Sequence, residues 1–92
     1  MPYIDPDQRT PYYKHGLNFI AGQLIEADNK GHLSGELNFL ISYLVRCVMT
    51  SNGENYARYN AIIGALECCK LELYRRMVGP YEDRAIERNG DV

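Results

Sequence analysis

The sequence predicts an all-α fold, a small helical hairpin or bundle that associates with further copies of itself. Three long segments with apolar residues three and four positions apart predict this fold, as do the glycines, asparagines and prolines that separate the segments. The chain has 92 residues, of which 46% are hydrophobic. This length suits a single domain, residues 1–92, whose own core is marginal, so we expect a homo-oligomer.

The first helix is expected to run from Asp7 or Pro11 to Asp28, and Asn29-Lys30-Gly31 follows as its stop signal. For the second helix we expect Ser34 as the N-cap and Ser51-Asn52-Gly53 as the end. Each helix has one apolar stripe that we expect to be buried. The stripes consist of Tyr13, Leu17, Ile20, Ala21, Leu24 and Ile25 in the first helix, and Leu37, Leu40, Ile41, Leu44 and Val48 in the second.

The third helix is expected to extend from Asn55 to Val78, a length of roughly 35 Å that suits packing against another chain. Gly79-Pro80 is expected to break it, and Pro80 would then begin a short helix from Tyr81 to Arg88. Residues 1–7 and 89–92 are expected to be extended arms. The apolar side of the third helix, which we expect to face the core, consists of Tyr59, Ile62, Leu66, Cys69, Leu73 and Met77.

The composition and the cysteine pattern exclude several classes of protein. Ten Lys and Arg against twelve Asp and Glu give a net charge of -2, which argues against general nucleic-acid binding. No apolar run is long enough for a membrane span, and the N-terminus does not resemble a secretory signal. Cys47 and the adjacent pair Cys68 and Cys69 are expected to be free thiols in a reducing cytoplasm. His15 and His32 have no partner at ligand spacing, so no metal and no cofactor are expected.

Polar and aromatic residues lie beside the apolar side of the third helix, three and four positions apart. They are Tyr56, Asn60, Ile63, Glu67, Lys70 and Tyr74. One interpretation is a pocket wall, in which tyrosine rings stack on a flat ligand and Lys70 binds an anion. The other interpretation is an intrahelical Glu67-Lys70 pair with tyrosines that pack against the helix surface.

Arginine and tyrosine are concentrated where the third helix is expected to end. Arg75 and Arg76 follow Tyr74, and Tyr81 and Arg84 come next. Guanidinium groups suit phosphate recognition, although cations also stabilise the last turn of a helix. Glu72 lies one turn before Arg76, whereas we expect Arg75 to lack an intrahelical partner. The predicted ligand-binding residues are Tyr56, Asn60, Glu67, Lys70, Tyr74, Arg75, Tyr81 and Arg84.

Several segments resemble a family of uncharacterised small phage and bacterial proteins. They are Met1-Pro2-Tyr3-Ile4, residues 35–39, residues 63–76, Pro80-Tyr81-Glu82-Asp83 and Asn89-Gly90-Asp91-Val92. The resemblance implies an accessory protein of a virus or mobile element in the bacterial cytoplasm, and it implies no activity.

No catalytic motif is present, so we do not expect an enzyme. The leading hypothesis is a protein that sequesters a small nucleotide-like signalling ligand and so antagonises host defence. The alternative is an adaptor or inhibitor that binds a host protein.

Overall fold

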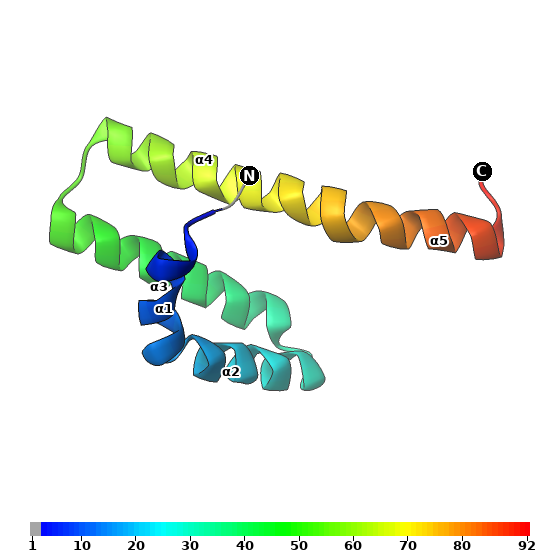
Figure 1. Ribbon diagram of the computed structural model, residues 1–92, viewed down its shortest axis with the longest axis horizontal. Coiled ribbons are helices and arrows are strands. Elements are labelled where there is room, and N and C mark those ends of the chain that lie inside the picture. The colour runs from blue at the N-terminus through cyan, green and yellow to red at the C-terminus, as the bar shows by residue number, and fades with distance from the viewer. Residues whose placement is uncertain (1–2) are drawn as a thin grey trace. The chain divides into compact units, whose positions relative to one another are not determined.

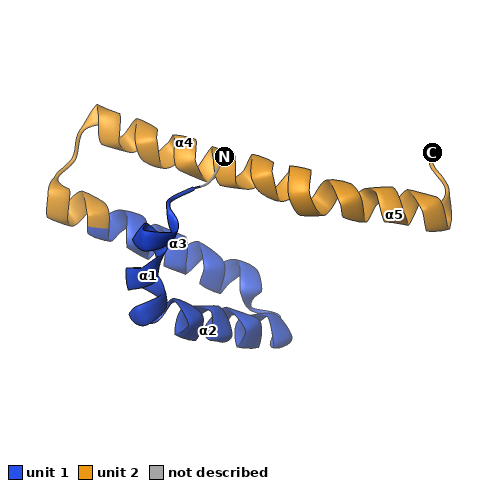
Figure 2. Ribbon diagram, in the orientation of Figure 1, with its two compact units in different colours: residues 1–47 blue, residues 48–92 orange. Residues whose placement is uncertain are grey.

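The computed structural model describes residues 3–92, and the regular structure within this range is helical, which confirms the all-α prediction. Figure 1 shows helices α1 to α5 in chain order. The chain divides into two compact units, residues 1–47 and residues 48–92, coloured separately in Figure 2.

The first unit contains α1 (Pro6–Lys14), α2 (Leu17–Asn29) and most of α3 (Leu33–Asn52). The prediction of one helix from Asp7 or Pro11 to Asp28 is therefore wrong. The helix is interrupted at Gly16, whose φ is 107°, a conformation that residues with a Cβ rarely adopt. The Gly16 carbonyl then accepts the amide of Ile20 at 3.0 Å and begins α2.

Helix α1 begins at Pro6, so the extended N-terminal arm is shorter than predicted. Asp5 precedes the helix, and its backbone N–H donates to the Gln8 side-chain oxygen at 2.8 Å. Pro6 occupies the first helical position, where its missing N–H costs no hydrogen bond. Met1 and Pro2, the start of the predicted arm, lie outside the described residues.

The turn between α2 and α3 is a Schellman motif. The Gly31 amide donates to the Asp28 carbonyl at 3.0 Å and the His32 amide to the Ala27 carbonyl at 2.8 Å, while φ of Gly31 is 78°. The predicted stop at Asn29-Lys30-Gly31 is confirmed. Ser34 is not the N-cap of the next helix, because the His32 carbonyl already accepts the Glu36 amide at 3.1 Å.

Replacement of Gly31 by alanine is expected to lower the free energy of unfolding by about 1–2 kcal/mol, because a Cβ disfavours the left-handed conformation. Chemical denaturation with circular dichroism measures the change. Gly35→Ala is the control, since Gly35 lies within α3 and a Cβ there would meet no atom within 4 Å. An equal loss in both variants, or no loss at Gly31, would show that the turn conformation does not limit stability.

The second unit begins with the end of α3 and continues into α4 (Tyr56–Leu73). Helix α3 ends at Asn52, as predicted, and the Asn55 side chain caps α4 by accepting the Arg58 amide at 2.7 Å. The Arg58 guanidinium donates to the carbonyls of Asn52 and Gly53. The Tyr59 hydroxyl donates to Glu54 at 2.7 Å, and this hydrogen bond raises the pKa of Tyr59.

The predicted break at Gly79-Pro80 is wrong, because α4 continues through a π-helical turn, η1 (Tyr74–Val78), into α5 (Gly79–Asn89). Proline has no N–H and disturbs the hydrogen bonds of a regular α-helix, and the wider π turn accommodates it. The Gly79 amide donates to the Tyr74 carbonyl five residues earlier. Helix α5 ends before Gly90, close to the predicted end of the short helix, and a short C-terminal tail follows.

The apolar stripes predicted to be buried are largely exposed within the described chain. Ala27 is the buried apolar residue, at 3% exposure, whereas Ile25, Leu44 and Leu73 are between 48% and 62% exposed. The expectation that Cys69 faces a core is wrong, because its side chain is exposed. Cys47, Cys68 and Cys69 are free thiols, as predicted.

Candidate functional site

The predicted ligand-binding residues all lie in the second unit, and all of their side chains are exposed. Helix α4 carries Tyr56, Asn60, Glu67 and Lys70, and the spacing of these residues places them on one helical face. Tyr74 and Arg75 begin η1, and Tyr81 and Arg84 belong to α5. Neither of the two pockets described below is lined by any of these eight residues.

Lys70 and Glu67 form an ion pair in which Nζ lies 3.1 Å from Oε1. This contact confirms the interpretation of an intrahelical pair on this face. Both side chains are more than half exposed, so the pair contributes less than about 1 kcal/mol to stability. The Lys70 side chain remains 59% exposed.

Glu72 interacts with both arginines of the π turn. Its Oε2 atom lies 2.8 Å from Arg76 Nε and 3.5 Å from Arg75 Nη2. The pairing of Glu72 with Arg76 is confirmed, whereas the prediction that Arg75 lacks an intrahelical partner is wrong. Spacings of three and four residues both bring helical side chains together, so a single carboxylate reaches both guanidinium groups. The Arg75 side chain remains 69% exposed.

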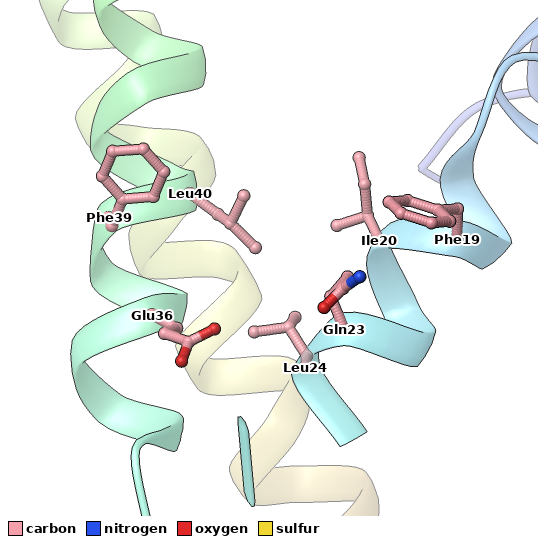
Figure 3. A pocket seen from close by; sticks show the side chains of 7 residues that line it. All are labelled: Phe19, Ile20, Gln23, Leu24, Glu36, Phe39 and Leu40. Carbon is pink, nitrogen blue, oxygen red and sulfur yellow. The ribbon is translucent and has the colours of Figure 1, made fainter. Parts of the chain in front are cut away.

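The first unit contains a pocket that sequence reasoning missed. Its volume is about 280 Å³, and residues of α2 and α3 line it: Phe19, Ile20, Gln23, Leu24, Glu36, Phe39 and Leu40. Figure 3 shows Ile20 and Leu24 of α2 facing Leu40 of α3 across this space. Both helices were expected to be amphipathic. The apolar spacing within each helix does not determine the distance between the two helices. It therefore could not predict that their side chains leave a space between α2 and α3.

A smaller hollow of about 140 Å³ lies along α3 beside the first. It is lined by Phe39, Ser42, Tyr43 and Arg46, so Phe39 borders both spaces. The rings of Phe39 and Tyr43 stack with centroids 6.0 Å apart and an interplanar angle of 29°. The Cys47 thiol one turn further on raises the pKa of Tyr43.

Within residues 3–92, no group of three or more His, Cys, Asp or Glu side chains is placed to hold a metal ion. In the same range, no helix is both long and apolar enough to cross a membrane.

Comparison with known proteins identifies a family for the whole chain. Searches of curated proteins and of solved structures gave no significant match. Residues 1–92 match the family described as Domain of unknown function (DUF6899). The protein therefore belongs to this family.

Proposed function

We propose that this protein is a non-enzymatic binding protein that sequesters a small anionic, nucleotide-like ligand on α4, η1 and α5. The observation that carries the proposal is the sharing of Glu72 by Arg75 and Arg76. The single negative charge of Glu72 pairs with two guanidinium groups, so one positive charge at the π turn is not neutralised by this carboxylate. An exposed guanidinium with spare donors suits a phosphate group.

Aromatic side chains beside these cations support the choice of a nucleotide-like ligand. Tyr74 is 56% exposed and begins the same π turn as Arg75, and Tyr81 of α5 is 59% exposed. Tyrosine rings stack on flat bases while guanidinium groups bind phosphate oxygens. Single π turns within α-helices often occur at functional sites, which also favours this position.

The resemblance to phage and bacterial proteins supports a role in the cytoplasm of a bacterial host. A protein that removes a nucleotide signal from solution needs no catalytic group. Such a protein would antagonise a host defence that depends on that signal.

Thermal unfolding in the presence of nucleotides and cyclic dinucleotides tests the proposal. A ligand at 100 times its dissociation constant stabilises the native state by about 2.7 kcal/mol, which raises the midpoint by on the order of 10 °C. We expect at least one compound of the panel to produce such a shift. If none does, the proposal is wrong.

Arg75→Ala separates ligand binding from stability. Because Arg76 retains Glu72, we expect the empty variant to lose less than about 1 kcal/mol of stability. The ligand-induced shift should disappear in this variant and persist in Arg88→Ala, a matched loss of charge near the end of α5. A full shift in Arg75→Ala would exclude the π turn as the binding site.

The second candidate function is binding to a host protein, and exposed apolar residues of the second unit favour it. Ile63, Leu71 and Met77 are between 57% and 66% exposed. Such side chains often mark a surface that a protein partner covers. An absence of any nucleotide-induced shift would leave this function as the better explanation of the second unit.

A further inference from the structure

The first unit has a surface that the proposed function does not use. We call it the α3 face and define it as Glu36, Phe39, Leu40, Tyr43 and Arg46. Successive members are three, one, three and three residues apart, so they share one side of the helix. The pocket and the hollow described above both open on this face.

The centre of the α3 face is apolar and aromatic, and it is accessible. Phe39 is 63% exposed and Tyr43 is 56% exposed, although their rings stack on one another. Aromatic side chains with polar residues at their rim are typical of protein interfaces. The face therefore has the composition of a docking surface.

Opposite charges lie at the two ends of the face. Glu36 and Arg46 are ten residues apart, which corresponds to about 15 Å along the helix axis. Among the described residues, Arg46 forms no ion pair, and the one ion-pair contact of Glu36 is with His32 Nδ1, 3.9 Å from its Oε2 atom. Both charges are thus available to a partner.

The order of residues along this face is nearly symmetric about position 41. Glu36 and Arg46 are each five residues from this position, and Phe39 and Tyr43 are each two residues from it. An antiparallel copy related by a two-fold axis would place each acid against a base and each aromatic ring against another. Interfaces of two-fold dimers have this self-complementary pattern, in which residue i contacts j and j contacts i.

We propose that a second copy of this chain docks on the α3 face, with the two α3 helices antiparallel. Glu36 then pairs with the partner's Arg46, and Phe39 packs against the partner's Tyr43. A second copy brings the matching charges and rings in the required order. The dimer also covers the aromatic side chains that the single chain exposes.

A charge exchange tests this proposal, with the mass in solution measured by sedimentation velocity. The wild-type protein is expected to have twice the mass of the 10.5 kDa chain. Glu36→Arg and Arg46→Glu each oppose like charges at both ends of the interface. We expect each single variant to raise the dissociation constant of the dimer at least about tenfold.

The double variant Glu36→Arg with Arg46→Glu restores opposite charges, and we expect it to restore the dimer. Arg88→Glu in α5 is the control for a charge reversal elsewhere, and it should leave the dissociation constant unchanged. Circular dichroism verifies that each variant keeps its helical content. A monomeric wild-type protein, a double variant as weak as either single variant, or an equal effect of Arg88→Glu would overturn the proposal.

Discussion

The midpoint of thermal unfolding is expected to rise by about 4 °C for each tenfold increase in protein concentration. The reason is that the aromatic side chains of Phe39 and Tyr43, exposed in the single chain, become buried on association. A tenfold change in concentration shifts the equilibrium of a dimer by about 1.4 kcal/mol, and the unfolding entropy of two such chains converts this energy into temperature.

Calorimetry over a hundredfold concentration range measures this dependence. The variant Glu36→Arg is the comparison, because its weaker dimer should unfold at a lower midpoint at every concentration. A midpoint that does not change with concentration would show that the chain unfolds as a monomer. Association would then contribute nothing to its stability.

The substitution Phe39→Asp is expected to destabilise the native protein by about 2–3 kcal/mol per protomer and to leave it monomeric. Phe39 borders both the pocket and the neighbouring hollow, and it stacks on Tyr43. Burial of a phenylalanine at an interface stabilises by about 1.5–3 kcal/mol, and a buried carboxylate without a partner adds a further cost. Since Phe39 is 63% exposed in the single chain, the helix itself should tolerate the change.

Tyr56→Asp is the matched control, because it makes the same kind of change at a residue that is 82% exposed at the start of α4. Denaturation and sedimentation of both variants measure the difference. If Phe39→Asp kept the wild-type mass and stability, the α3 face would have no role in association. If Tyr56→Asp had the larger effect, the assembling surface would lie in the second unit.

Helix ends were predictable from the sequence where one residue decides them locally. Gly31 and Asn55 are such cases, because a positive φ and a side-chain cap depend on nearby atoms alone. The predictions of a continuous helix across Gly16 and of a helix break at Pro80 were wrong. Apolar residues repeat with helical spacing across Gly16 without a change, and a π turn keeps the helix continuous before Pro80.

The local part of the candidate site was also predictable. The pair Glu67 and Lys70 follows from helical spacing alone, and so does the contact of Glu72 with Arg76. The contact with Arg75 does not follow from the four-residue spacing, because Glu72 lies three residues before Arg75. The pocket between α2 and α3 depends on the distance between these two helices. The spacing of apolar residues within each helix does not determine that distance.

The distance between spin labels on Cys47 tests the antiparallel α3 dimer most directly. Cys47 is an exposed native thiol, and replacement of Cys68 and Cys69 by serine leaves it as the single site for labelling. Cys47 lies six residues from the centre of symmetry at position 41, so the two labelled positions are separated by about 18 Å along the helix axis. Pulsed electron paramagnetic resonance should report a distance in this range after allowance for the labels. A separation near 10 Å would indicate parallel helices, and the absence of any coupling between labels would show that no dimer forms on this face.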